Sequence, residues 1–144
     1  MKHVAMLSFW VLLAFFLMLN HEKIPTSPPD AKVNSEISEL LELHNKQRLT
    51  RGRKALVIDE ELCKYAQKHA EFMARKNKLV HSDLSGIKFR VAGENIAWGQ
   101  KTAEDVVNSW MWSPSHKANI LRSEYKKVGF GITESRYWCV VFGG

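Results

Sequence analysis

Val128-Gly129-Phe130-Gly131-Ile132 alternates apolar side chains with glycine near the end of a chain of 144 residues. This alternation predicts a half-buried strand, and the stretch 136–142, which follows Glu134-Ser135, predicts its hairpin partner. The glycines leave one face of the first strand open to close packing. The sequence therefore predicts antiparallel strands at the end of the chain.

Three helices are predicted before this hairpin, and each opens on a residue that commonly caps a helix. They cover about 35–52, 59–77 and 102–114, with Ser35, Asp59 and Thr102 as the caps. One further helical turn is expected over 116–121. In the second helix an apolar stripe is formed by Leu62, Ala66, Ala70 and Met73. Helices first and strands last favour an α+β domain in which helices cover a small antiparallel sheet.

The first twenty residues have the features of an export signal. Lys2 precedes sixteen residues, Val4 to Leu19, that are apolar except for Ser8. As a helix they reach about 24 Å, less than the roughly 30 Å hydrocarbon layer, which favours a signal peptide over a membrane anchor. No Ala-x-Ala pattern follows the run, so an uncleaved anchor stays open as the alternative. In both cases the remaining chain is expected outside the cytoplasmic membrane, extracellular or tethered to it.

Residues 21–33 are expected to form a linker, and residues 34–144 one folded domain. Pro25, Pro28 and Pro29 remove backbone donors and favour an extended chain. The remaining stretch, about 110 residues long, is sufficient for a single core.

Cys63 and Cys139 are expected to form a disulfide, because an exported chain with two cysteines meets an oxidising compartment. Two buried thiols that pack as small apolar side chains are the alternative.

The chain has a formal net charge of +6, and basic residues crowd the segment between Lys46 and Lys54. No helix-turn-helix, zinc-finger or aromatic RNA-binding pattern accompanies them, so no nucleic-acid partner is expected. The charges predict a solvated surface, with attraction to anionic lipid or an envelope polymer as the alternative.

Three segments contain side chains that can bind a ligand or a metal. They are Leu79-Val80-His81-Ser82, Gly93-Glu94-Asn95-Ile96-Ala97-Trp98 and the segment 113–121, which contains His116. The imidazoles of His81 and His116 and the carboxylate of Glu94, on separate loops, can converge on one polar cleft. From the residues alone, however, the favoured interpretation is a loop histidine without a role at His81 and a locally hydrogen-bonded histidine at a helix start at His116. These three groups suit zinc with a fourth position open to water. The chain has no His-x-x-x-His pair on one helix, so local spacing does not support the zinc prediction.

Other histidines and tryptophans have simpler interpretations. His44 and His69 fall beside apolar positions of the predicted helices and are interpreted as packed or boundary residues. Trp98, Trp110 and Trp112 either line an apolar groove for a lipid or peptide or lie in the core. A serine nucleophile beside His116 is not supported, because the chain has no Gly-x-Ser-x-Gly motif.

The sequence resembles the CAP superfamily of cysteine-rich secretory proteins, antigen 5 and pathogenesis-related 1 proteins, also called the SCP domain. The resemblance is carried by Leu41-Glu42-Leu43-His44-Asn45-Lys46-Gln47-Arg48, by 62–70, by Gly93 to Trp98, by Val128-Gly129-Phe130-Gly131 and by Tyr137-Trp138. It implies a three-layer α-β-α sandwich, with an antiparallel sheet between helical layers and a large open cleft.

In that family the cleft holds two histidines and two glutamates. His81, Glu94 and His116 match three of these positions, whereas Ser113 stands where animal and plant members have the second glutamate. The segment 113–121 is similar to the prokaryotic branch of the family. The resemblance thus implies a cleft that contains His81, Glu94, Ser113 and His116.

Two functions follow as expectations. The first is an extracytoplasmic binding module that takes a lipid, a small apolar ligand or an envelope component in or beside the cleft. The second is a zinc-dependent hydrolase or peptidase, with His81 and His116 as ligands and Glu94 as ligand or base. A structural tether, whose function would not depend on the cleft, is a third interpretation.

Overall fold

The computed structural model describes residues 29–144, and the predicted export signal lies outside the described residues. The helices are α2 (Pro29–Leu49), α3 (Glu60–Lys76), α4 (Ala103–Trp112) and α5 (Pro114–Leu121), with a 3-10 helix η1 (Leu84–Gly86). The strands are β1 (Val57–Ile58), β2 (Ala92–Trp98), β3 (Lys127–Ile132) and β4 (Tyr137–Gly143). Among the described helices, none combines the length and apolar composition needed to cross a bilayer.

The four strands form one sheet in the order β1-β3-β4-β2. Strands β3 and β4 form the predicted hairpin, and β2 pairs antiparallel with the other side of β4. The short strand β1 pairs parallel with β3. The sheet is therefore mixed, which corrects the expectation of a purely antiparallel one.

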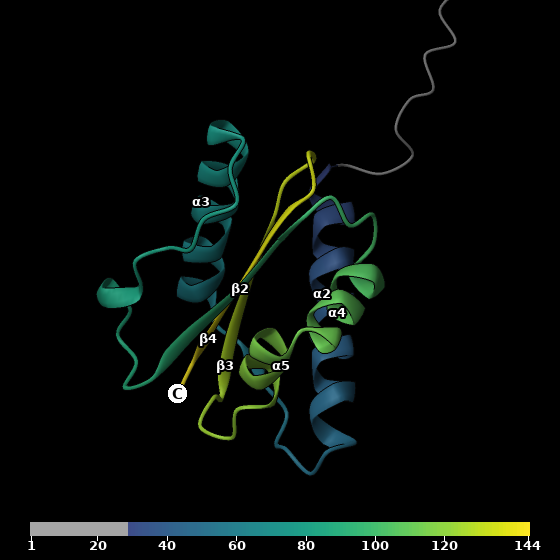
Figure 1. Ribbon diagram of the computed structural model, residues 1–144, viewed down its shortest axis with the longest axis vertical. Helices are drawn as coiled ribbons and strands as arrows, with labels where there is room; N and C mark the ends of the chain where they lie inside the picture. Colours follow the sequence, from purple (N-terminus) through teal and green to yellow (C-terminus); the bar gives the residue numbers. More distant parts are fainter. Residues whose placement is uncertain (1–28) are drawn as a thin grey trace, which may run out of the picture.

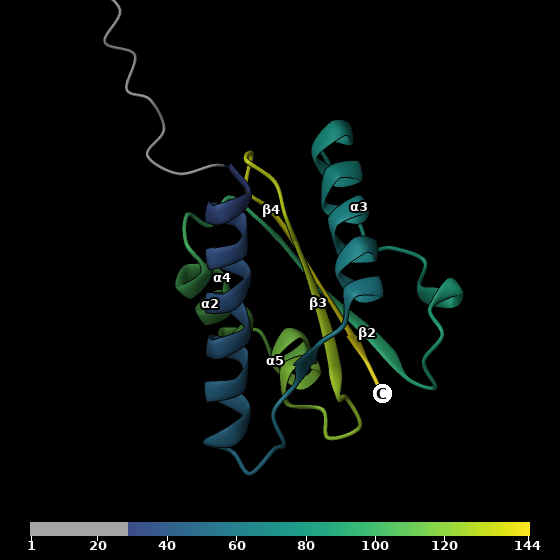
Figure 2. The ribbon, with the colours of Figure 1, turned by 180° about the vertical axis from the view of Figure 1, so that it is seen from behind.

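Helices cover both faces of this sheet, as Figure 1 shows and Figure 2 confirms from behind. Helix α3 and the segment that contains η1 lie on one face, and α2, α4 and α5 lie on the other. The core next to α3 includes Leu62, Met73 and Val141, and the larger core on the other face includes Trp110 and Trp138. The predicted α-β-α sandwich is thus confirmed.

Glycine lets α3 approach β3 very closely. A Cβ atom at Gly131 would lie 2.3 Å from the backbone carbon of Ala66, and one at Gly129 would lie 2.1 Å from that of Leu62. The predicted stripe on α3, which contains these two residues, is buried against the sheet. Close packing at the alternating glycines is therefore confirmed.

Two of the predicted helix caps are present. The Asp59 carboxylate accepts a hydrogen bond from the backbone N–H of Leu62 at 3.0 Å, and the Thr102 hydroxyl accepts one from that of Asp105 at 3.1 Å. Each bond satisfies a donor that the first turn of a helix leaves free.

The start of α2 differs from the prediction. The helix begins at Pro29, so Ser35 lies within it and the last five residues of the expected linker, 29–33, are helical. Proline is well accommodated in a first helical turn, because its missing N–H would have no partner there.

The guanidinium of Arg48 joins α2 to two neighbouring segments. It is fully buried, and it donates hydrogen bonds of 2.8–3.0 Å to four backbone carbonyls. Those carbonyls belong to Lys54, Ile120, Arg122 and Tyr125. One side chain thus fixes the loop after α2 and the segment between α5 and β3.

His44 is a packed residue, as predicted. Its Nδ1 lies 2.7 Å from the carbonyl oxygen of Leu40, and its ring contacts Trp110, Phe130 and Phe142. Burial lowers the pKa of His44 from 6.5 to about 4, so the ring is neutral at physiological pH.

The expected disulfide is not formed, since Cys63 and Cys139 are both free thiols. The sulfur of Cys139, on β4, lies 3.6 Å from a carboxylate oxygen of Glu94 on β2. The thiol of Cys63 instead lies by the backbone of Phe130 on β3. The two sulfurs therefore have different neighbours, which lie on the two strands that flank β4.

The three tryptophans do not line one groove. Trp110 is buried, and its indole Nε1–H donates to the carbonyl of Ile96 at 3.2 Å. Trp98 and Trp112 are 58% and 89% exposed, so only one of the three lies in the core.

Candidate functional site

Glu94 is the centre of the candidate site, and it lies on strand β2 rather than on the expected loop. Its side chain is only 3% exposed. One carboxylate oxygen accepts from the Ser82 backbone N–H at 3.0 Å and from His81 Nδ1 at 2.7 Å. The other accepts from the Ser82 hydroxyl at 2.5 Å and from the Cys139 thiol at 3.6 Å. Glu94 therefore ties the segment 81–82 to the sheet.

The hydrogen bond to Glu94 determines how the His81 ring is presented. Because the acceptor is a carboxylate, Nδ1 of His81 carries the hydrogen and Nε2 of the neutral ring has a free lone pair. The His81 side chain is 64% exposed. The buried carboxylate of Glu94 thus orients the His81 ring, and the ring remains open to a ligand from solvent.

The Cys139 thiol is an inert donor to this carboxylate. Burial raises the pKa of Cys139 well above its usual value, and the negative charge of Glu94 raises it further. A thiol that stays protonated has little nucleophilic character. Its contribution to the site is therefore a hydrogen bond and packing.

His69 on α3 also reaches the site, although its sequence pattern indicated only a packed or boundary residue. Its Nε2 lies 2.7 Å from the carbonyl oxygen of Val80 and 3.9 Å from the Glu94 carboxylate. Its ring stacks on Phe72, with the ring centroids 5.9 Å apart. His69 thus connects α3 to the segment that carries His81, a contact that no local spacing indicates.

Two asparagines attach α5 to β2. Asn95 Nδ2 donates to the His116 carbonyl at 3.0 Å, and Asn119 Nδ2 donates to the Glu94 carbonyl and to Asn95 Oδ1 at 3.0 and 2.9 Å. These contacts connect residues 21 to 25 positions apart in the chain. Both asparagines lie in the segments singled out by the sequence, but their role depends on the fold.

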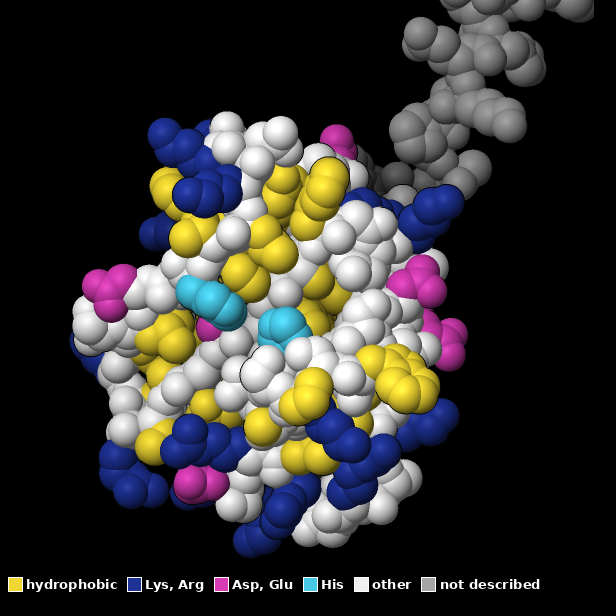
Figure 3. Space-filling view, viewed as in Figure 1, with side chains coloured by type: hydrophobic (Ala, Val, Ile, Leu, Met, Phe, Trp, Pro, Cys, Tyr) yellow, Lys and Arg dark blue, Asp and Glu magenta, His cyan; other side chains and the backbone are white. Residues whose placement is uncertain are grey.

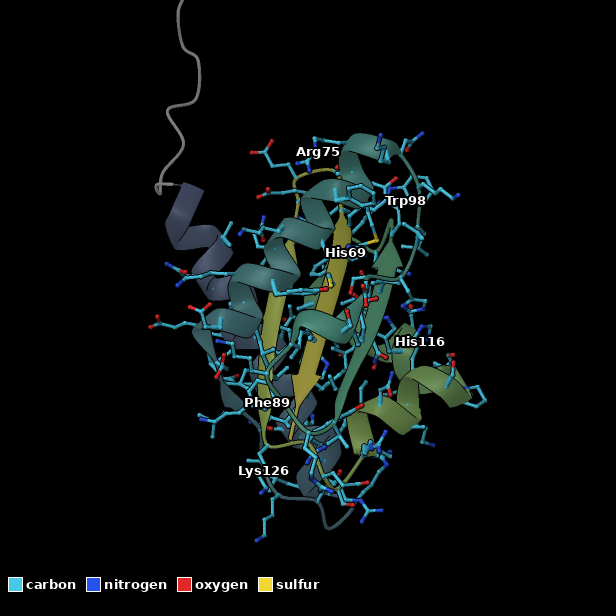
Figure 4. The ribbon with its side chains drawn as sticks, turned by 90° about the vertical axis from the view of Figure 1, so that its left-hand side faces the viewer. His69, Arg75, Phe89, Trp98, His116 and Lys126 are labelled. Carbon is cyan, nitrogen blue, oxygen red and sulfur yellow. The ribbon has the colours of Figure 1, made fainter. Side chains whose placement is uncertain are left out.

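His116 is close enough to His81 for their charges to interact. Burial lowers the pKa of His116, and the positive charge of protonated His81 lowers it further. Figure 3 shows histidine side chains side by side in the middle of one face, with an acidic side chain beneath. Figure 4 shows His116 at the beginning of α5 and His69 on α3.

Ser113 occupies the junction between α4 and α5. Its backbone N–H bonds to the Trp110 carbonyl, and its hydroxyl lies 3.4 Å from that of Ser115. Pro114 then begins α5 instead of only ending α4. Ser113 therefore ends α4 and precedes the first residue of α5.

The pair His81 and His116 fits a metal better than the predicted set of His81, Glu94 and His116 does. Within residues 29–144, no three His, Cys, Asp or Glu side chains are grouped so that they could hold a metal ion. Glu94 is already surrounded by four donors, which favours it as the group that orients His81 rather than as a ligand. Nitrogen atoms of His81 and His116 are the groups that suit zinc.

A hollow of about 640 Å³ lies beside His81, between α3 and the segment 78–83. Its lining includes the exposed apolar side chains of Phe72 and Val80 together with Lys76 and Lys78. The remaining lining residues are Tyr65, His69, His81, Ser82 and Asp83. The volume falls within the roughly 300–1,000 Å³ typical of sites for small ligands.

Comparison with known sequences identifies relatives along most of the chain. A sequence model of the cysteine-rich secretory protein family, CAP, matches residues 41–142. The uncharacterized protein YkwD of Bacillus subtilis is 39% identical over 121 residues, or 76% of this chain and 47% of YkwD. This chain thus spans about half the length of YkwD.

Solved structures share the same fold. An extracellular protein containing an SCP domain from Bacillus anthracis matches with a TM-score of 0.73 and 21% identity, covering 83% of this chain and 45% of that one. The crystal structure of NaASP2 with Zn2+ matches with a TM-score of 0.61 and 18% identity, covering 75% and 78% of the two chains. At these identities the likeness concerns the fold.

Proposed function

Because this chain belongs to the CAP family of cysteine-rich secretory proteins, we propose that it is an extracytoplasmic binding module for a lipid or another small apolar ligand. The observation that carries the proposal is the hollow beside His81. Apolar side chains line it and remain open to solvent, with Phe72 40% and Val80 36% exposed. Covering them with a ligand would remove apolar surface from water.

The charged groups around the hollow favour a ligand with a polar or anionic end. Lys76 and Lys78 lie among the lining residues, where a carboxylate or phosphate group would meet ammonium groups. His81 and Ser82 add polar groups at the side held by Glu94. This combination of an apolar surface with a few polar groups is typical of small-molecule sites.

The proposed location outside the cytoplasm is supported by the export pattern in the first twenty residues. The matching protein from Bacillus anthracis is described as extracellular. An unprocessed N-terminal segment would tether the domain to the membrane.

The full chain, purified in a neutral detergent, tests this proposal against a panel of fatty acids and lysophospholipids. Wild type is expected to bind at least one single-chain lipid, and Phe72→Asp is expected to weaken binding at least about tenfold, because a charge would replace apolar contact surface. Trp112→Asp is the matched control, since Trp112 is 89% exposed and is not among the lining residues. Absence of lipid binding by wild type, or equal loss in both variants, would contradict the proposal.

A zinc-dependent hydrolase is the second candidate, and the hydrogen bond between His81 and Glu94 favours it. That bond leaves Nε2 of His81 available, and orientation of a histidine ligand by a carboxylate is common at zinc sites. His81 and His116 would hold the ion, which would supply an activated water. NaASP2, a structural neighbour, was crystallised with Zn2+.

Calorimetric titration of the full chain with zinc at neutral pH separates this candidate from the first. Both His81→Ala and His116→Ala are expected to abolish binding, and Glu94→Gln to weaken it about 10- to 100-fold through loss of the orienting carboxylate. His3→Ala, a change outside the described residues, controls for loss of any histidine. If wild type binds no zinc, the hydrolase is ruled out and the lipid proposal is unaffected.

A further inference from the structure

The positive charge of this chain is concentrated in two segments. Residues 46–54 and 117–127 contain nine basic residues and one acidic residue, Glu124, a formal charge of +8. The basic residues are Lys46, Arg48, Arg51, Arg53, Lys54, Lys117, Arg122, Lys126 and Lys127. Since the whole chain carries +6, all other residues together carry −2. The net positive charge of the chain therefore comes from these two segments and not from the other residues.

The fold brings these two segments together at one end of the molecule, which we call the basic end. Arg48 binds carbonyls of both segments, and the Val57 N–H, just after the first segment, donates to the Lys126 carbonyl at 3.0 Å. Figure 3 shows Lys and Arg side chains gathered at the lower end of the view. Figure 4 places Lys126 at the end opposite Arg75.

The basic end contains a second hollow, of about 280 Å³. Its lining residues are Gly52, Arg53, Lys54, Ser123, Tyr125 and Lys126. Gly52 turns the chain with a φ of 69°, after which the Arg53 N–H returns to the Arg48 carbonyl at 2.9 Å. The cations of Arg53, Lys54 and Lys126 are thus carried by backbone that Arg48 holds in place.

Gathering these cations has an electrostatic cost that an anion would relieve. Burial lowers the pKa of the Arg48 guanidinium, and the charge of nearby Arg53 lowers it further, which indicates mutual repulsion. Arg53, Lys54 and Lys126 are exposed, so a bound anion can reach them. Fixed cations around a hollow raise the local concentration of anions.

We infer that the basic end binds a linear polymer with repeated phosphate groups. The two segments carry further cations that do not line the hollow, at Arg51, Lys117 and Lys127, and a chain of anions could contact more of these than one small anion can. This surface shares no residue with the hollow beside His81, and the inference is independent of the proposed lipid site.

The position of the basic end favours a polymer over a membrane surface. Helix α2 begins at Pro29 at the other end of the molecule and, with 21 residues, spans about 30 Å. If the segment before Pro29 anchors the chain in a membrane, the chain enters the domain at the end remote from the basic end. At physiological salt, charge attraction decays over about 8 Å, much less than that distance.

Linear polyphosphate is the test ligand, titrated against the full chain in a neutral detergent at about 50 and about 200 mM salt. Wild type is expected to bind with an affinity that falls steeply with salt. The triple variant Arg53→Gln, Lys54→Gln, Lys126→Gln should bind at least about tenfold more weakly, with a shallower salt dependence, because three ion contacts are lost. The matched control is Lys64→Gln, Lys68→Gln, Lys101→Gln, which changes the net charge equally and should bind within about twofold of wild type.

Two further binding measurements distinguish a phosphate polymer from free phosphate and from a lipid surface. Inorganic phosphate is expected to compete only at much higher phosphate concentration than the polymer, and vesicles with anionic phosphatidylglycerol are expected to bind more weakly than polyphosphate. Failure of wild type to bind polyphosphate, equal loss in the control variant, or preference for phosphate or vesicles over the polymer would each overturn the inference.

Discussion

The Nδ1 atom of His81 lies 2.7 Å from Oε1 of Glu94, although the side chain of Glu94 is 3% exposed and that of His81 is 64% exposed. A buried carboxylate thus holds a surface histidine in one orientation. The same carboxylate accepts both the backbone and the side-chain hydrogen bonds of Ser82. The orientation of the His81 ring and the stability of this face therefore depend on the same residue.

Glu94→Ala is expected to reduce the free energy of unfolding by about 3 kcal/mol, because it leaves several donors around the carboxylate without an acceptor. Chemical denaturation followed by tryptophan fluorescence would measure the change. Glu104→Ala is the control, since Glu104 is exposed in the first turn of α4. Nearly equal stability of the two variants would mean that the Glu94 contacts contribute little to folding.

His44 is expected to make the protein less stable in mild acid. The pKa of His44 is about 4 when folded and 6.5 when exposed, so between these values the unfolded chain binds a proton that the folded chain does not. Stability should therefore be complete above pH 6.5 and fall by about 3 kcal/mol as the pH drops to about 4. Denaturation curves across this range would show it.

His44→Gln serves as the comparison for this pH dependence, because glutamine does not titrate there. The variant should be less stable at neutral pH, and its stability should change less between pH 6.5 and about 4. An unchanged slope would show that other groups cause the acid sensitivity.

Arg48→Lys is expected to cost about 3 kcal/mol of unfolding free energy. An ammonium group can donate from one point only, whereas the four carbonyls around Arg48 are spread along the planar guanidinium. Thermal unfolding would report the loss. Arg51→Lys, at an exposed position in the following turn, should melt close to wild type; a similar melting temperature for both variants would contradict this account.

Gly131→Ala is expected to destabilise the fold by at least about 2 kcal/mol, because its Cβ would overlap the backbone of α3 at Ala66. Gly86→Ala is the control, since a Cβ there meets no atom within 4 Å. Comparison of the two melting temperatures tests the prediction. If Gly131→Ala melts like Gly86→Ala, α3 can move away from β3 at little cost.

Thiol labelling would determine the state of the cysteines. Cys63 is half-buried and Cys139 is buried with a raised pKa, so the native chain should react at Cys63 first and the denatured chain at both positions. The Cys63→Ser variant should react very slowly until it unfolds. Absence of labelling in denatured, unreduced protein would indicate a disulfide instead.

The elements that could be predicted are those with a local signal. Helix α3 has a cap at Asp59, an apolar stripe and an end at Asn77, and the β3 strand has strict alternation, so each pattern is complete within one short segment. Strand β2 was not predicted, and Glu94 was expected on a loop. Gly93, Glu94 and Asn95 are poor strand formers, so this segment has no local strand signal. Pairing along β4 places this segment in the sheet.

The candidate site required more than local patterns. The resemblance to a family identified His81, Glu94 and His116, but not the way in which Glu94 is surrounded. The contacts of Asn119 and His69 join separate elements, and no periodicity reports such contacts. The roles of the adjacent polar residues Glu94 and Asn95, near the start of β2, therefore depend on the packing of α3 and α5 around them.

The outer side of β2 is an unpaired sheet edge, since β4 occupies its other side. Backbone groups of alternate residues on such a strand point away from its partner and can recruit a strand from another molecule. Two of the carbonyls, those of Glu94 and Ile96, are taken by Asn119 Nδ2 and Trp110 Nε1. Asn119, which attaches α5 to the sheet, and the core residue Trp110 therefore also shield part of this edge from pairing with a strand of another molecule.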